Sequence, residues 1–230
     1  MHLSKKRFNQ KSIYNAQKRY AIKILFCFFL LIFTTFTAHS APNSAKSKKN
    51  HTIVILGDSI SAAYGVPTES GWVSLLQQKL KHENKSHTVV NASISGETTK
   101  GGIERLPAII KRHQPSILII ELGGNDGLRG FPLNLIKDNL QTLVDQAKDN
   151  NITPILVAMR IPPNYGRRYT SGFYNIFEQV AQENNIALVP FLLEEVALNT
   201  ELMQADGIHP TALAQPILLE HIWESLTTLL

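Results

Sequence analysis

The chain has 230 residues, 43% hydrophobic and 18% charged, a composition typical of one globular domain and not of a disordered protein. Its formal net charge is +5, but residues 1–41 hold seven of the 23 Lys and Arg residues and no acidic residue. The rest of the chain carries 16 Lys and Arg against 18 Asp and Glu, a net charge of −2, which disfavours a nucleic-acid partner.

Residues 1–40 have the pattern of an export signal. Basic residues run to Lys23, ten apolar residues follow at 24–33, and Ala38 and Ser40 have the spacing of a signal-peptidase site. A membrane-spanning helix needs roughly 20 apolar residues. We therefore predict a cleaved signal peptide over residues 1–40, with an uncleaved signal anchor as the alternative, and a periplasmic or secreted protein. A polar linker is expected at 41–51, and a single domain at 52–230.

The only cysteine, Cys27, lies inside the apolar run of the signal segment. The mature chain would then have no disulfide, no thiolate nucleophile and no cysteine-based metal site.

The domain begins with a predicted buried strand at residues 52–56, which runs into Gly57-Asp58-Ser59. A glycine lets the chain turn sharply as it leaves a sheet. The serine would then stand at the start of a following helix, where free backbone N–H groups favour negative charge. Asp58 and Ser59 are equally typical of helix caps, so this block alone is ambiguous.

Two further strands are each followed by a polar block. A helix at 72–80 and a strand at 88–90 lead to Ser93-Ile94-Ser95-Gly96-Glu97, where Gly96 could offer a backbone N–H or simply belong to a loop. A helix at 103–110 and a strand at 117–122 lead to Gly123-Gly124-Asn125-Asp126. The Asn125 amide could donate to an oxyanion, although an ordinary Asn-Asp turn is the alternative.

The remaining elements continue the alternation. They are a helix at 133–147, a strand at 154–158, a helix at 173–181, a strand at 187–189 and a last helix at about 212–229. Asp206-Gly207-Ile208-His209-Pro210 precedes the last helix. A serine needs a base to take its proton and a carboxylate to orient that base, and Asp206 and His209 can meet within one tight turn.

Short strands alternating with helices predict an α/β fold with a mainly parallel five-stranded sheet covered on both faces. Ligands bind at the carboxyl ends of such strands, which is where the polar blocks fall. Together the blocks supply a nucleophile, oxyanion donors, a base and an orienting acid, the set that acyl transfer requires.

The four blocks resemble those of the SGNH or GDSL hydrolases, in order and in approximate spacing, from residue 52 to the C-terminus. The run from Gly57 to Gly65, the run from Gly123 to Gly130 and the segment 161–166 are most similar to the periplasmic thioesterase I/lysophospholipase/arylesterase branch. The resemblance implies a flavodoxin-like three-layer α/β/α sandwich and a serine esterase or thioesterase that needs no metal or cofactor.

The resemblance also implies a role for each block. Ser59 would attack the acyl carbon, His209 would move the proton and Asp206 would orient His209. The backbone N–H groups of Ser59 and Gly96 and the side chain of Asn125 would hold the oxyanion.

The substrate is expected to be a small acyl ester or a lipid, with at most transient contact to a membrane surface. The acyl pocket should be apolar, with walls at residues 128–131 and 161–169, the second a mobile rim. The residues expected to bind substrate are Leu128, Phe131, Pro162 and Tyr165. Arg167 and Arg168 could meet an anionic head group or be solvated surface charge. A monomer is favoured, because the last helix is expected to pack on its own domain.

Three other functions fit parts of the pattern. A carbohydrate or peptidoglycan O-acetylesterase would share the triad and differ in the pocket walls. A nucleotide-binding module is disfavoured, because Asp58 stands where phosphate would sit and no phosphate-loop lysine follows. A catalytically inactive binding protein would leave the complete set of catalytic groups unexplained.

Overall fold

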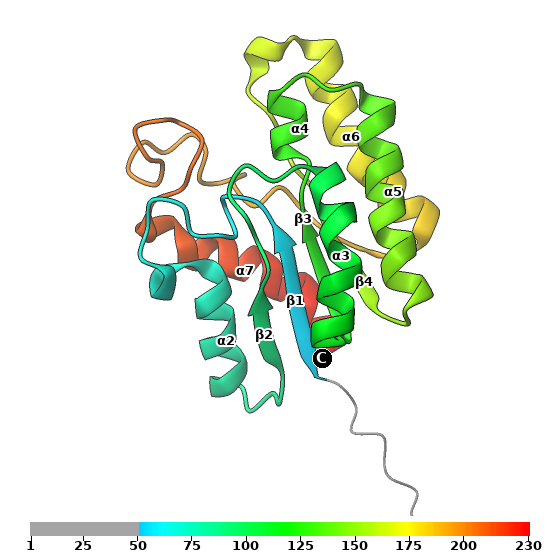
Figure 1. The fold of residues 1–230 in the computed structure, drawn as a ribbon. Coiled ribbons are helices and arrows are strands. Elements are labelled where there is room, and N and C mark those ends of the chain that lie inside the picture. Colours follow the sequence, from blue (N-terminus) through cyan, green and yellow to red (C-terminus); the bar gives the residue numbers. More distant parts are fainter. Residues whose placement is uncertain (1–50) are drawn as a thin grey trace, which may run out of the picture. The chain divides into compact units, whose positions relative to one another are not determined.

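The five apolar runs form five parallel strands in the computed structural model, which describes residues 51–230 (Figure 1). The strands are β1 (Thr52–Gly57), β2 (Thr88–Asn91), β3 (Ile117–Glu121), β4 (Thr153–Val157) and β5 (Ala187–Val189). Their order in the sheet is β2-β1-β3-β4-β5, and each pair is parallel. This is the flavodoxin-like order, and it confirms the predicted fold class.

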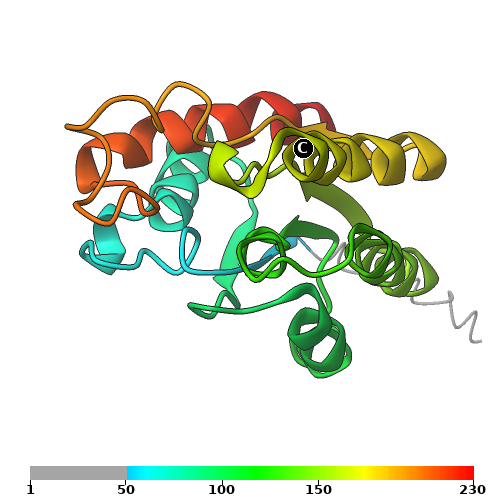
Figure 2. The ribbon, with the colours of Figure 1, turned by 90° about the horizontal axis from the view of Figure 1, so that it is seen from above.

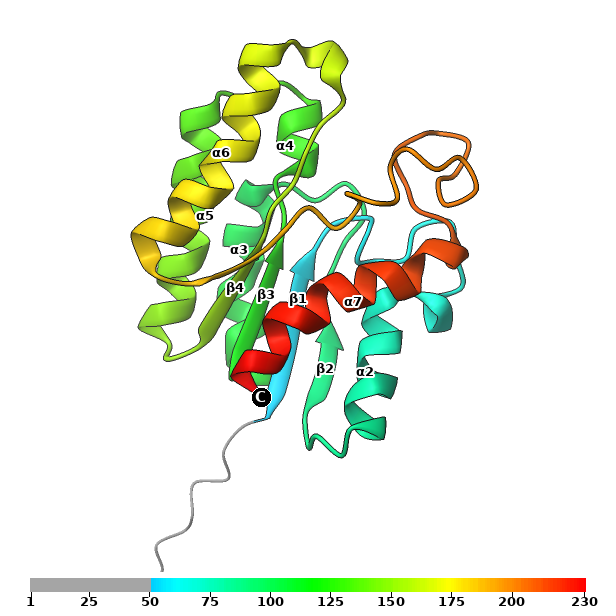
Figure 3. The same ribbon diagram turned by 180° about the vertical axis from the view of Figure 1, so that it is seen from behind.

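Helices cover both faces of the sheet. The helices are α2 (Trp72–His82), α3 (Thr99–His113), α4 (Gly124–Leu128), α5 (Leu133–Asp149), α6 (Arg167–Asn184) and α7 (Gln215–Leu226), with short 3-10 turns at Thr68–Ser70, Pro163–Tyr165, Ala212–Ala214 and Thr227–Leu229. Helices α3, α5 and α6 share one apolar core with the sheet, and α2 and α7 share the other. Figure 3 shows α2 and α7 lying across the second face.

The central strands are buried because alternate side chains enter opposite cores. Val54 and Leu56 of β1 contribute to the core under α3 and α5, whereas Ile53 and Ile55 contribute to the core under α2 and α7. This explains why β1 is a continuous apolar run instead of an alternating one. The last helix packs as expected on its own domain, with Leu226 fully buried.

Two helices begin earlier than their apolar spacing predicts. Helix α3 begins at Thr99 because the Thr98 hydroxyl accepts a hydrogen bond from the Gly101 N–H (3.2 Å) and so caps the helix. Helix α6 begins at Arg167, and its first turn is solvent-facing, so no apolar periodicity marks it before Phe173. Residues 167–169 of the expected rim are therefore helical.

The loop after β1 also differs from expectation, because Ser59 does not stand at the start of a helix. Residues 59–65 form consecutive turns, with the Tyr64 N–H donating to the Ser59 carbonyl (3.0 Å). Ala63 has a φ of 59°, a left-handed conformation that a right-handed helix cannot contain.

The signal peptide or anchor predicted over residues 1–40, and the linker up to residue 50, lie outside the described residues. Within residues 51–230, no helix is both long and apolar enough to cross a membrane.

Candidate active site

The polar blocks meet above the carboxyl ends of β1 and β3. Figure 2 looks down on this edge of the sheet, with α4 at its centre. Strands β1 and β3 are neighbours although β2 lies between them in the chain, so the connections leave in opposite directions and open a crevice. Ligands bind at such switch points in open α/β sheets. Ser59 follows β1 and Asn125 follows β3, so both stand at this crevice.

A continuous chain of contacts joins Ser59, His209 and Asp206. The Oγ atom of Ser59 lies 2.9 Å from Nε2 of His209, and Nδ1 of His209 lies 2.7 Å from Oδ2 of Asp206. Oδ1 of Asp206 accepts the backbone N–H groups of Ile208 (2.9 Å) and His209 (3.0 Å). The hydrogen bond from the His209 ring, followed by these backbone bonds, lowers the pKa of Asp206 to about 2. The Asp206 side chain is therefore an ionised carboxylate at neutral pH and can accept the proton on Nδ1 of His209.

The loop that carries His209 is tied to the loop that carries Ser59. Gln204 donates from its side-chain amide to the carbonyls of Tyr64 (2.8 Å) and Pro210 (2.9 Å). The ring of Tyr64 packs against that of His209 at a tilt of 38°, with centroids 4.4 Å apart. No motif in the sequence singled out Gln204, because its partners are 140 and 6 residues away.

Two buried carboxyl groups lie beneath Ser59. Asp58 accepts the Ile60 N–H (3.0 Å) and the side-chain amide of Asn125 (3.1 Å). Glu121, at the end of β3, accepts the Asp58 N–H (3.1 Å) and the Ser61 hydroxyl (2.6 Å). Burial raises the pKa of Asp58 to about 6 and raises that of Glu121 well above its usual range. The sequence offered no signal for Glu121, since it ends an apolar run and belongs to no motif.

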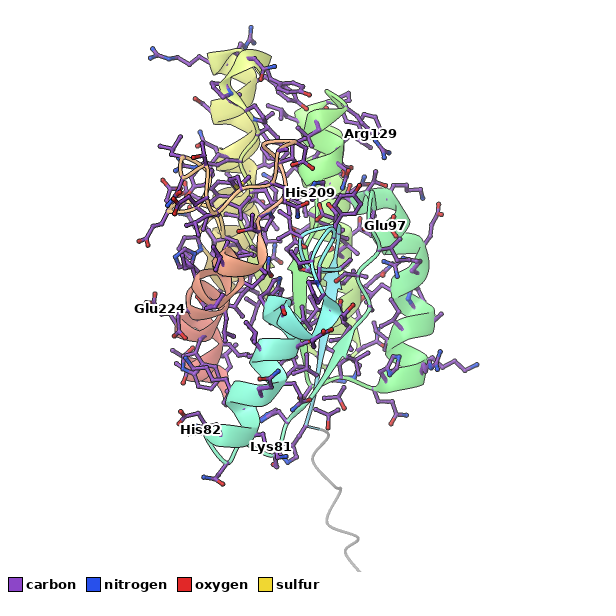
Figure 4. The ribbon with its side chains drawn as sticks, turned by 90° about the vertical axis from the view of Figure 1, so that its left-hand side faces the viewer. Lys81, His82, Glu97, Arg129, His209 and Glu224 are labelled. Atoms are coloured by element: carbon purple, nitrogen blue, oxygen red, sulfur yellow. The ribbon has the colours of Figure 1, made fainter. Side chains whose placement is uncertain are left out.

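Gly96 lies on a neighbouring loop and is not among the residues that line the cavity described below. Its φ is +79°, which favours glycine, and its carbonyl accepts a hydrogen bond from Arg129 (3.1 Å). Figure 4 shows Arg129, Glu97 and His209 at the same end of the domain. The structure thus brings Ser59, His209, Asp206 and Asn125 together and places Gly96 beside α4.

Asp126 joins the Gly96 loop to the Asn125 block. Its fully buried carboxylate accepts both the N–H (2.9 Å) and the hydroxyl (2.6 Å) of Thr99, the first residue of α3. Asn139 of α5 donates to the same hydroxyl (2.9 Å). Asp126 therefore links α4 to α3, and Thr99 in turn links α3 to α5. The place of Asp126 in a short polar block did not reveal this role.

A cavity of about 860 Å³ extends from Ser59 and His209 toward the β4–β5 side of the domain. Of the expected substrate-binding residues, Leu128 and Pro162 line it, whereas Phe131 and Tyr165 do not. Tyr165 instead donates its hydroxyl to the Leu128 carbonyl (2.7 Å), which ties the two predicted walls together. Further apolar lining residues, which no motif marked, are Met159, Tyr174, Phe191, Leu193, Leu198 and Met203.

The arginine pair of the expected rim lies apart from this cavity. Arg167 and Arg168 are exposed at the start of α6, and Arg160 is the arginine that lines the cavity, where it pairs with Glu194 (3.3 Å). Among the described residues, no three His, Cys, Asp or Glu side chains are grouped as metal ligands.

A serine, a histidine and a carboxylate joined in this order, at the switch point of a flavodoxin-like sheet, define a serine hydrolase. The chain belongs to the GDSL-like lipase/acylhydrolase family, whose model matches residues 55–215. This membership confirms the resemblance that the four motif blocks indicated.

Proteins of known name agree with this assignment. The chain is 48% identical to the esterase TesA of Pseudomonas aeruginosa over 179 residues, 78% of this chain and 89% of that protein. It is 42% identical to thioesterase 1/protease 1/lysophospholipase L1 of Escherichia coli K12, over 88% of this chain and 91% of that protein. The crystal structure of the esterase EstA from Pseudoalteromonas sp., inhibited by monoethylphosphonate, superposes with a TM-score of 0.75 at 42% identity, covering 78% and 98% of the two chains. The protein is a serine hydrolase that acts on carboxylic ester or thioester bonds.

Proposed function

We propose that Ser59, His209 and Asp206 are the catalytic triad of this hydrolase. The observation that carries the proposal is the unbroken contact chain from Ser59 Oγ through the His209 ring to Asp206 Oδ2, at 2.9 and 2.7 Å. Because Asp206 accepts the proton on Nδ1, the imidazole presents an unprotonated Nε2 to the serine hydroxyl. That is the tautomer a general base requires.

The reaction then proceeds in two acyl transfers. Ser59 Oγ attacks the acyl carbon while its proton passes to Nε2 of His209, and the carbonyl oxygen becomes an oxyanion. The imidazolium returns the proton to the leaving alkoxide or thiolate, which departs and leaves an acyl-serine. A water molecule repeats the sequence, with His209 taking its proton, and releases the carboxylic acid.

The oxyanion donors are proposed to be the backbone N–H groups of Ser59 and Gly96 and the side-chain amide of Asn125. Asp58 supports this role for Asn125, because it accepts one of the two amide protons and leaves the other free. Loss of one such donor typically costs about 3 kcal/mol of transition-state stabilisation.

We propose acyl chains longer than acetyl as the substrate. The cavity of about 860 Å³ is near the upper end of the range for small-ligand pockets, and most of its lining side chains are apolar. An acetyl group needs little of this space, so the geometry disfavours the carbohydrate or peptidoglycan O-acetylesterase alternative. The thioesterase and lysophospholipase names of the E. coli relative are in line with a longer chain.

We also propose that the protein is exported as a monomer with no nucleic-acid partner. The basic segment, apolar run and small residues within positions 1–40 support export. The packing of α7 on its own domain supports a monomer, because it leaves the apolar face of this helix covered.

The test is hydrolysis of para-nitrophenyl esters from acetyl to palmitoyl by wild type, Ser59→Ala and His209→Ala. Triad members act as a unit, so each substitution is expected to lower kcat by roughly 10⁴-fold or more. Labelling by a fluorophosphonate should be lost in Ser59→Ala, because the nucleophile is absent. Full activity in either variant would refute the triad, and a preference for acetyl over longer esters would restore the acetylesterase reading.

A further inference from the structure

Glu121 is a fully buried carboxyl group that none of the acyl-transfer steps uses. Its Oε2 atom accepts the Asp58 N–H (3.1 Å) and the Ser61 hydroxyl (2.6 Å). Asp58 immediately precedes Ser59 and Ser61 follows two residues later, so one oxygen atom holds the loop on both sides of the nucleophile. A group with this placement can set the direction of the Ser59 N–H and Oγ.

The close approach of this carboxyl group depends on Gly57. Gly57 stands opposite Glu121 in the β1–β3 ladder, and a Cβ atom at Gly57 would lie 2.6 Å from Glu121 Oε2. The same Cβ would lie 2.7 Å from the Cβ of Ser61. The glycine before Asp58 therefore makes room for Glu121 and Ser61, besides allowing the chain to turn.

The charge on this pair of carboxyl groups can be assigned from their partners. Asp58 accepts two N–H donors, from Ile60 and from Asn125, whereas Oε1 of Glu121 is buried with no hydrogen-bond partner among the described residues. A negative charge spread onto an unpaired buried oxygen is costly, and two neighbouring carboxylates resist double ionisation. Asp58 is thus the better site for the anion and Glu121 for the proton.

The neighbouring ionisable groups agree with this assignment. The charge of Asp58 adds to burial in raising the pKa of Glu121, and the charge of His209 acts on Asp58 in the opposite direction. The Glu121 carboxyl also has neutral neighbours, which include the Ser61 hydroxyl and the backbone N–H groups of Asp58 and Ser61.

We propose that Glu121 is a positioning residue that works as a neutral carboxylic acid. Its acceptor oxygen holds the loop of Ser59, and its retained proton lets Asp58 remain the anion that orients the Asn125 amide toward the oxyanion. The proposal rests on the proposed function in that Ser59 is taken as the nucleophile and Asn125 as an oxyanion donor.

Two substitutions of similar length separate the neutral acid from a charged or merely space-filling group. Glu121→Gln keeps an acceptor oxygen and a neutral side chain, so kcat should stay within about fivefold of wild type. Glu121→Met removes the acceptor and leaves the Asp58 N–H and the Ser61 hydroxyl unpaired. Its kcat should fall on the order of 100-fold, with KM within about threefold, because the loop is misplaced while the apolar residues that line the cavity are unchanged.

Either of two kinetic results would overturn the proposal: a Gln variant as impaired as the Met variant, or a Met variant with wild-type kcat. Thermal unfolding monitors whether each variant is folded. If Glu121→Met does not fold, Ser61→Ala takes its place, since it removes one of the two donors to Oε2. Its kcat should then fall about tenfold with KM nearly unchanged, and an unchanged kcat would count against the proposal.

The proton itself can be observed without any activity measurement. At pH 8, where Asp58 with its pKa of about 6 is ionised, the infrared spectrum of wild type should contain the carbonyl band of a buried protonated carboxyl group. The band should be absent from Glu121→Gln and present in Ser59→Ala, so a failure of the proposed triad would leave this result intact. Absence of the band in wild type would overturn the neutral-acid assignment.

Discussion

Ser59 and His209 are 150 residues apart in the chain, and their contact depends on side chains beside both of them. The Tyr64 ring packs against the imidazole, and Gln204 links the two loops through the Tyr64 and Pro210 carbonyls. Asp206 mainly fixes the orientation of the His209 ring, since its carboxylate accepts the ring N–H and two backbone N–H groups. The proposed chemistry depends on which ring nitrogen of His209 carries the proton.

Replacement of Asp206 by Asn tests the tautomer. An amide cannot accept the Nδ1 proton with its NH₂ group, so the imidazole is expected to present a protonated Nε2 to Ser59. We expect kcat to fall by about 10³ to 10⁴-fold with little change in thermal unfolding, measured on a para-nitrophenyl ester. Asp149→Asn, an exposed acid at the end of α5, is the matched control and should retain full activity. An active Asp206→Asn variant would leave Asp206 without its proposed role.

Asp58 should make the free energy of unfolding depend on pH. Its pKa is about 6 in the folded protein against 3.8 for an exposed acid, so the folded state binds the proton more tightly. Its contribution to stability is complete below pH 3.8 and is lost as the pH rises through 6, by about 3 kcal/mol at most. The Asp58→Asn variant has no ionisable group at this position, so it should not show this loss of stability.

The measurement is chemical unfolding of wild type and Asp58→Asn at several values between pH 4 and pH 8. The difference in free energy of unfolding should move in favour of the variant as the pH rises, whatever its value at pH 4. Asp149→Asn controls for general charge effects. A difference that is constant over this range would show that Asp58 is not titrating in the folded protein.

At the scale of the elements, the distances between predicted oxyanion donors depend on how α3 and α4 are joined. Gly96 precedes α3 and Asn125 lies in α4, and these helices follow different strands. Asp126 connects them through the N–H and hydroxyl of Thr99, and Arg129 reaches back to the Gly96 carbonyl. The spacing of the donors is thus set by interhelical hydrogen bonds and not by the strands alone.

Asp126→Ala removes this link. Two buried donors of Thr99 lose their acceptor, so the free energy of unfolding should fall by about 2–4 kcal/mol. The Gly96 loop should shift as well, and kcat should fall on the order of 100-fold at permissive temperature. Urea unfolding and ester kinetics measure the two effects, with the exposed Asp138→Ala in α5 as the control. Unchanged kcat in a destabilised but folded variant would limit Asp126 to a structural role.

Across the whole molecule, charge is distributed unevenly along the chain, with a basic N-terminal segment that we predict to direct export and a hydrolase domain at 52–230 that carries 13 Lys and Arg against 18 Asp and Glu. The positive formal charge belongs to the first 41 residues, and residues 51–230 contain the whole sheet and both cores. Export would place the enzyme in an oxidising compartment, and the predicted mature chain has no cysteine that could be oxidised there.

Processing of the full chain tests this division. We expect the exported protein to begin at Ala41, because Ala38 and Ser40 supply the small residues before the cleavage site. Intact-mass measurement of the periplasmic or secreted fraction determines the N-terminus. Ala38→Arg should block cleavage and leave the protein attached to the membrane. An exported wild-type protein that still begins at Met1 would favour the signal anchor instead.

The strand–helix order and the residues of the motif blocks could be predicted from the amino-acid sequence. The central strands β1, β3 and β4 were predictable because their side chains are mostly buried on both faces, so that burial appears directly as an unbroken apolar run. The first residues of α3 and α6 were not predictable from apolar spacing. Helix α3 begins at a capping hydroxyl and the first turn of α6 faces solvent, and neither feature leaves an apolar pattern. Asp206 and His209 were predictable as a pair because a contact over three residues is local.

The groups that act through long-range contacts were identified from the folded protein. Glu121 meets Ser61 across 60 residues, and Gln204 meets Tyr64 across 140, so no local pattern could mark either. The cavity likewise extends to the β4–β5 side, where Phe191 and Leu198 line it, beyond the walls expected from the motifs, because it is enclosed by loops that are distant from one another in the sequence. A motif identifies residues whose chemistry is needed, whereas their geometry and charge state depend on neighbours that the fold brings to them.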